Sequence, residues 1–172
     1  MIAELGQIFL ISAFSLFLVH LILSLKVLIS KNYNYFYEAS ETLFFISNLV
    51  LLIPFLLLMY SYYHSDFSLL NIYNNSHTSK PIIYKISGTW GNHEGSLMMW
   101  LAMLGSYGIL VVSLKKNIPT VFSNYLLTTI TIVNLGFVGF TIFTSNPFER
   151  IFPIPDEGLG LNPVLQDPGL AF

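Results

Sequence analysis

The sequence predicts an all-α integral membrane protein with four transmembrane helices, an outer polar loop and a proline-rich C-terminal loop. Of its 172 residues, 54% are hydrophobic and only 9% are charged, whereas a soluble domain carries roughly 25% charged residues. The mean hydropathy is +0.68. Four apolar stretches are each long enough, at about 1.5 Å per helical residue, to cross a hydrocarbon core of about 30 Å. We expect spans at about residues 5–25, 43–63, 93–114 and 125–144, with outer loops at 64–92 and 145–172.

Composition excludes several classes of function. The formal net charge of −2 at pH 7 and the absence of a basic patch argue against nucleic-acid binding. A chain without cysteine forms no disulfide, no thiolate zinc site and no cysteine nucleophile. The histidines are scattered, without an HExxH pattern or paired carboxylates, so the sequence offers no preformed metal site. They are His20, His64, His77 and His93.

The first span, residues 5–25, is expected to stay in the mature protein, because Met1 to Gln7 lacks the basic start of a cleaved signal. His20 lies within this span. An ionisable residue inside a span is a candidate functional residue. Near a helix end, however, such a side chain can reach headgroups or a neighbouring carbonyl, and we favour this interpretation for His20.

The second span, residues 43–63, carries Pro54 near its middle, where we expect a kink that serves packing rather than gating. Tyr60, Tyr62 and Tyr63 are expected to form an aromatic belt where the helix leaves the bilayer. Residues 64–87 show neither a helical nor a strand period, which predicts a solvated loop.

Within this loop, His64 and Asp66 are close enough for a weak metal pair, but no further ligand follows at a regular spacing. Solvated side chains are therefore favoured there. Residues 81–86, PIIYKI, could form a short strand or an extended lead into the stretch that follows.

The densest polar and glycine chemistry lies in residues 87–100, SGTWGNHEGSLMMW. Asn92 is well placed as the N-cap of the third span, and Glu94 falls in the first turn, where a carboxylate meets the positive end of the helix dipole. The stretch therefore indicates a functional site at a membrane surface. Residues that allow close backbone approach or offer flat amphipathic surface are Gly88, Gly91, Gly95, Trp90 and Trp100.

Small and polar residues predict how the last two spans pack. In the fourth span, Asn134 with Gly136 and Gly139 indicates a buried helix contact, because an amide facing lipid would lack partners. In the third span, four small residues favour packing within the bundle, namely Ala102, Ser106, Gly105 and Gly108.

The last segment, residues 145–172, shows no regular period and is expected to be a loop with turns. Because proline fixes the backbone angle φ, its prolines should make a stiff extended surface. The prolines are Pro147, Pro153, Pro155, Pro163 and Pro168.

The positions of the lysines predict the orientation in the membrane. Four lysines lie in the short connectors, against two lysines and Arg150 in the long loop and tail. The positive-inside rule then places both polar loops outside.

Three motifs carry a resemblance to a known family. They are TWGNHEGS at residues 89–96, TSNPFER at 144–150 and LNPVLQDPGLAF at 161–172, and MIAELGQ opens the chain. Because these motifs occur in this order around spans of this spacing, the chain resembles the N-terminal part of the large haem-lyase protein of the cytochrome c maturation system. That family of cytochrome c-type biogenesis proteins includes nitrite-reductase-associated relatives. Motifs of this length are far more specific than a lone glycine pattern.

The resemblance implies a lyase component of the bacterial inner membrane, or alternatively of the mitochondrial inner membrane, with its motifs facing outward. It implies haem as cofactor, haem transport from a haem chaperone, and covalent attachment of haem to apocytochrome c with its thiol-reducing partners. Membrane lipid and the remaining C-terminal part of the same protein are the other partners. Candidate haem- or partner-facing residues are Trp90, Gly91, His93, Glu94, Gly95, Ser96, Asn162, Pro163, Gln166, Asp167, Pro168 and Gly169.

In the family, a histidine-containing HPP segment and a tryptophan-rich haem-handling domain follow the QDPGLAF sequence. The axial haem ligands lie in those parts, so none of the four histidines here inherits that role. We therefore expect no catalytic residue in this chain and no lyase activity from these 172 residues alone. The alternative is a membrane transporter or channel segment, motivated by His20, Pro54 and Asn134 inside spans.

Overall fold

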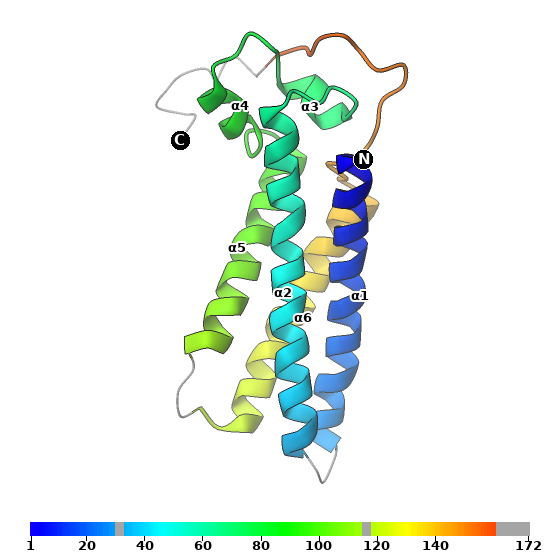
Figure 1. Cartoon of the computed structure of the whole chain (residues 1–172). Helices are drawn as coiled ribbons and strands as arrows, with labels where there is room; N and C mark the ends of the chain where they lie inside the picture. The colour runs from blue at the N-terminus through cyan, green and yellow to red at the C-terminus, as the bar shows by residue number, and fades with distance from the viewer. Residues whose placement is uncertain (30–32, 115–117, 161–172) are drawn as a thin grey trace.

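A computed structural model describes residues 1–29, 33–114 and 118–160, with only the backbone of residues 33–35 (Figure 1). In this part of the chain all regular structure is helical, apart from one isolated antiparallel bridge between Leu69 and Arg150. The prediction of an all-α fold with four long apolar helices is confirmed. The helices are α1 (Ile2–Ile29), α2 (Tyr33–Tyr63), α3 (Leu70–Asn75), α4 (Ile82–Gly88), α5 (His93–Leu114) and α6 (Thr120–Phe143).

The four long helices form one antiparallel bundle. Helix α1 packs against α2 and α6, and α5 packs against α2 and α6 on the other side. Figure 1 shows the N-terminus, α3, α4 and the segment after α6 together at one end of the bundle. Each long helix is long and apolar enough to cross a membrane. Both polar segments therefore lie at the same end, as an even number of crossings requires.

An asparagine pair joins α2 to α6 inside the bundle. Asn134 is fully buried, and its Nδ2 donates to Oδ1 of Asn48 at 3.2 Å. Asn48 in turn donates its own Nδ2 to the carbonyl of Phe44 at 2.8 Å. The predicted buried contact at Asn134 is thus confirmed, and its partner is an amide that no sequence pattern marked. Each amide supplies the other with a partner that lipid cannot provide.

Glycines let α5 approach this pair. A Cβ on Gly108 would lie 2.5 Å from Oδ1 of Asn48, and one on Gly105 would lie 3.3 Å from the Asn48 carbonyl. The expected packing role of these two glycines is confirmed. Ala102 and Ser106 instead line an open groove between α2 and α5, so the same expectation was wrong for them.

Helix α2 shows a strict division between its faces. It runs through Pro54 without a break, and Pro54 is buried. Tyr60 and Tyr63 are half exposed, at 50% and 47%, as an aromatic belt requires. Tyr62 is fully buried, so its assignment to that belt was wrong. It shares the inward face with Leu58, four residues earlier, at helical spacing.

His20 lies inside the bundle, where its side chain is fully buried. Its Nδ1 is 2.7 Å from Oγ1 of Thr131 on α6, and its ring packs against Phe44 of α2 with 5.2 Å between ring centroids. The expectation that His20 reaches headgroups or a carbonyl was wrong. Helix α1 continues to Ile29, about 13 Å beyond His20, which keeps this residue within the bilayer.

The two glycines Gly108 and Gly136 provide a matched test of helix approach. A Cβ on Gly136 meets nothing within 4 Å, whereas one on Gly108 overlaps Asn48. Both changes to alanine gain the same intrinsic helix propensity. We expect Gly108→Ala to be less stable than Gly136→Ala by about 1–3 kcal/mol, from overpacking. Thermal unfolding of the two variants in the same detergent measures the difference, and equal unfolding temperatures would contradict the close approach.

Candidate functional site

The candidate site belongs to a cap at one end of the bundle, which we define as residues 64–92 and 144–160. In Figure 1 it covers the end where α1 begins and α2 and α6 finish. Residues 64–87 are not the solvated loop that the sequence predicts, because α3 and α4 form within them. Residues 82–88 are helical, so the strand alternative was wrong. Phe67, Leu69 and Ile72 are buried in the hydrophobic core, which anchors the cap to the bundle.

Asn92 is the N-cap of α5, as predicted. Its Oδ1 accepts from the Gly95 backbone N–H at 2.8 Å, which satisfies one of the free donors at a helix start. Its Nδ2 donates to the Gly88 carbonyl at 2.9 Å and to the Tyr62 hydroxyl at 2.9 Å. One amide side chain therefore joins the start of α5 to the ends of α2 and α4.

Asn71 extends this network to α3. It is buried, and its Nδ2 donates to Oδ1 of Asn92 at 2.7 Å and to Oε2 of Glu94 at 3.0 Å. Its Oδ1 accepts from the Tyr62 hydroxyl at 2.6 Å. The polar network is thus Tyr62, Asn71, Asn92 and Glu94. Asn92 and Glu94 could be predicted because they lie at a helix start. No local pattern in the sequence indicated that Asn71 would join them or that Tyr62 would point inward.

The turn between α4 and α5 is held by close backbone contact. A Cβ on Gly95 would overlap the Thr89 carbonyl oxygen, so the expected close approach at Gly95 is observed. The Ser96 hydroxyl donates to the Trp90 carbonyl at 2.7 Å, and the Gly91 N–H bonds to the Ser87 carbonyl at 3.1 Å. The candidate residues 90–96 therefore form one compact, internally bonded unit.

His93 faces the other side of this unit and is exposed. Its Nε2 lies 3.0 Å from Oγ of Ser145, directly after α6, and its ring meets the Phe140 ring edge-on at 6.4 Å between centroids. The contact joins the start of α5 to the end of α6. It therefore gives His93 a structural partner in the cap.

Backbone hydrogen bonds and one carboxylate attach the segment after α6 to α3. The Leu70 N–H donates to the Glu149 carbonyl at 2.9 Å, and the Leu159 N–H donates to the Tyr73 carbonyl at 2.8 Å. The Glu157 carboxylate accepts from both the hydroxyl and the backbone N–H of Thr78. Hydrogen bonds from Thr78 lower the pKa of Glu157 to about 2.

Arg150 ties this segment to the first helix. Its guanidinium contacts the Glu4 carboxylate at 2.5 Å and donates to the Ser68 hydroxyl at 3.1 Å. Nearby, Phe148 is buried and packs over Gly6, where a Cβ would overlap the Phe148 ring. The cap is therefore fastened to α1, α2 and α5 by different residues.

The histidines of the described residues do not gather around one site. His64 packs against Tyr60 and Tyr63, and His77 lies 3.8 Å from the Glu157 carboxylate. His20 contacts Thr131, and His93 contacts Ser145. Residues 1–29, 33–114 and 118–160 hold no group of three His, Asp or Glu side chains placed for a metal ion. This part of the chain therefore does not fit a haem site with an opposed pair of histidine ligands.

Half of the candidate residues fall within the part of the chain that the structure describes. Trp90, Gly91 and His93 to Ser96 occupy the turn and first turn of α5 described above. The others lie outside the described residues, namely Asn162, Pro163, Gln166, Asp167, Pro168 and Gly169.

Comparison with known proteins gives one consistent result, although no family model matches the chain. Cytochrome c-type biogenesis protein CycK of Rhizobium meliloti is 45% identical over 123 residues, which cover 72% of this chain and 18% of that protein. CcmF of Escherichia coli is 40% identical over 119 residues, 69% of this chain and 18% of the relative. NrfE of Haemophilus influenzae is 40% identical over 116 residues, 67% of this chain and 18% of the relative.

The fold is similar as well. A solved structure named cytochrome c haem lyase CcmF superposes with a TM-score of 0.79 at 25% identity, over 87% of this chain and 25% of that one. The resemblance inferred from the motifs is therefore confirmed. The chain spans only about 18% of the length of the curated relatives it matches.

The Glu157 contact predicts a pH dependence of the cap. Because the folded pKa of about 2 lies below the unfolded value of roughly 4.3, the contact is fully formed above that unfolded value and is lost as pH falls towards 2. We expect the amide protection of residues 157–160, corrected for intrinsic exchange rates, to fall between roughly pH 5 and pH 2.

Two variants isolate the carboxylate. Glu157→Gln should give weaker protection that no longer depends on pH over this range. Asp156→Asn removes the neighbouring exposed carboxylate and should keep the wild-type pH dependence. An unchanged pH profile in Glu157→Gln would contradict this assignment.

Proposed function

We propose that this chain, a homologue of the cytochrome c-type biogenesis proteins CcmF, CycK and NrfE over about 70% of its length, serves as a membrane component of a haem lyase. In this role it would help to receive haem from a haem chaperone and support its covalent attachment to apocytochrome c. The observation that carries the proposal is the identity of 40–46% to these relatives. The TM-score of 0.79 to a haem lyase structure supports it independently.

The cap suggests what these residues contribute. Forming a thioether bond requires haem held with its vinyl groups beside the substrate thiols, so positioning carries much of the barrier. The network of Tyr62, Asn71, Asn92 and Glu94 fixes the turn that carries Trp90 in one arrangement. Gly95 and Ser96 bond or pack within that turn, and in this proposal Trp90, Gly91 and His93 would face haem or a partner.

No residue of the described part is proposed as an axial haem ligand. His93 is engaged by Ser145, and the four histidines contact different groups. The ligands, and with them the reaction, would come from the part of the relatives that this chain does not match. Apocytochrome c, its thiol-reducing partners and the haem chaperone would bind the assembled lyase rather than these residues alone.

The proposed location is a bacterial inner membrane, with the mitochondrial inner membrane as the alternative and the cap facing the outer compartment. Four membrane-spanning helices and bacterial relatives support the membrane assignment. The orientation is supported by Lys26 in the last turn of α1, at the end opposite the cap, and by the sequence positions of Lys31, Lys115 and Lys116 between the long helices. A transporter or channel role is not favoured, because Nδ2 of Asn134 and Nδ1 of His20 each bond to a side chain of a neighbouring helix inside the bundle.

Single cysteines test the orientation cleanly because the chain has none of its own. Asn74→Cys and Asp156→Cys lie in the exposed cap and should react with a membrane-impermeant maleimide in intact cells. Glu38→Cys, exposed at the opposite end of α2, should react only after permeabilisation. Labelling of Glu38→Cys alone in intact cells would show the inverted orientation.

The function is tested in cells that lack every other maturation lyase. The 172-residue chain should attach no haem to a reporter cytochrome c by itself, and should restore attachment when expressed with the polypeptide that matches the rest of the relatives. Haem staining and the Soret spectrum report the two outcomes. Covalent haem made by the chain alone, or no rescue by the pair, would refute the proposal.

His93→Ala and Ser145→Ala separate positioning from ligation in that assay. Since they remove opposite ends of one hydrogen bond worth about 1 kcal/mol, both should lower haem attachment by roughly fivefold. The axial-ligand signature of the bound haem should remain in both. Loss of that signature in His93→Ala alone would identify His93 as a ligand.

A further inference from the structure

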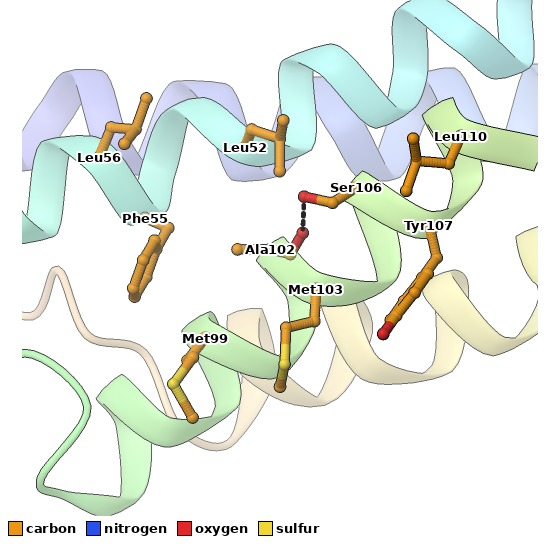
Figure 2. A pocket seen from close by; sticks show the side chains of 9 residues that line it. All are labelled: Leu52, Phe55, Leu56, Met99, Ala102, Met103, Ser106, Tyr107 and Leu110. Atoms are coloured by element: carbon orange, nitrogen blue, oxygen red, sulfur yellow. Dashed lines mark hydrogen bonds between the residues drawn. The ribbon is translucent and has the colours of Figure 1, made fainter. Parts of the chain in front are cut away.

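A groove of about 550 Å³ runs between α2 and α5 on the outside of the bundle. Figure 2 shows its walls, with α2 side chains on one side and α5 side chains on the other. It extends from Met99 to Leu110, about 16 Å or three helical turns. Its lining is apolar apart from one serine and one tyrosine, and consists of Leu52, Phe55, Leu56, Met99, Ala102, Met103, Ser106, Tyr107 and Leu110.

The groove contains a pair of small residues one turn apart on α5. Ala102 and Ser106 would let another helix approach α5 closely, as small residues at this spacing do in membranes. The Ser106 hydroxyl donates to the Ala102 carbonyl at 2.8 Å, so it presents no unpaired donor to an apolar neighbour. The glycine face of the same helix already packs against α2 through Gly105 and Gly108. Helix α5 thus has two faces suited to close packing, and the described residues cover one.

Tyr107 distinguishes a protein neighbour from lipid. It is 65% exposed, and its hydroxyl has no hydrogen-bond partner among the described residues. Figure 2 shows its ring lying back along α5 towards Met103 and away from Leu110, and α5 ends four residues after Leu110, at Leu114. Tyr107 is itself about 10 Å from that end. A hydroxyl at this depth has no partner in hydrocarbon, whereas a neighbouring helix can offer a carbonyl or polar side chain.

We infer that this groove is the docking site for a transmembrane helix from the polypeptide that matches the rest of the relatives. The inference rests on the proposed function, since relatives of which this chain matches only 18% carry the remaining chain. The docking helix presents an apolar side chain over Ala102 and Ser106 and a hydrogen-bond acceptor at the level of Tyr107. Its contact joins this bundle to the part of the lyase that holds the haem ligands.

A photoreactive side chain tests which molecule occupies the groove. Benzoylphenylalanine replaces Met103, 44% exposed in the groove, or Ile132, 56% exposed on α6, in the full chain co-expressed with the matching polypeptide. Mass spectrometry of the adduct from position 103 should identify one transmembrane segment of that polypeptide. Adducts with lipid alone, or with a second copy of this chain, would overturn the inference. An equal yield of the same adduct from position 132 would also overturn it.

A bulky residue in the groove tests the close approach. Ser106→Leu should lower the cross-link yield from position 103 by about tenfold, which corresponds to the loss of one good interhelical contact. Ser15→Leu is the matched control, because Ser15 is exposed on α1 and makes the same hydroxyl bond to a carbonyl one turn earlier. It should leave the yield unchanged. An unchanged yield in Ser106→Leu would contradict helix docking.

Two further readouts keep the conclusions separate. Both leucine variants should unfold at the wild-type temperature, because neither site is buried within the bundle. A specific cross-link without restored haem attachment would reject the proposed function and keep the docking site. Restored attachment with only lipid adducts would reject the docking site and keep the function.

Discussion

The arrangement of the cap depends on one amide side chain at a helix start. Asn92 satisfies the first turn of α5 and at the same time bonds to Gly88, Tyr62 and Asn71. Each of its polar atoms has partners, in a region where an unpaired buried group costs about 1–3 kcal/mol. An ordinary capping residue stabilises its own helix. Here the same residue joins the start of α5 to α2, α3 and α4, and so it holds the turn that carries the candidate residues from Trp90 to Ser96.

The sequence could predict the fold because membrane spans follow from length and hydropathy alone. It also predicted the N-cap of α5, since Asn92 and Glu94 occupy standard positions at a helix start. The helices α3 and α4 have only six and seven residues, too few for a period to show. They form because the cap buries residues such as Leu69 and Ile72 against the bundle, which is a tertiary effect.

The polar partners inside the bundle were equally hidden from sequence reasoning. Asn134 could be assigned to a buried contact because lipid offers an amide nothing, but that argument does not name Asn48 as its partner. His20 was misplaced for a related reason: the helix is longer than the apolar run suggests, so depth in the bilayer was underestimated. Tyr62 shows the same limit, since composition locates a tyrosine near an interface and only the helix face tells which way it points.

The contacts of Glu4 and Gly6 in α1 with the segment after α6 have a consequence for biosynthesis. Glu4 and Gly6 are synthesised at the start of the chain, whereas their partners Arg150 and Phe148 follow α6. The ion pair and the aromatic contact can therefore form only after α1 to α6 have all been synthesised. A nascent chain that stalls before α6 leaves Gly6 uncovered and Glu4 without Arg150. The cap is in this way complete only once α6, the fourth of these long helices, is in place.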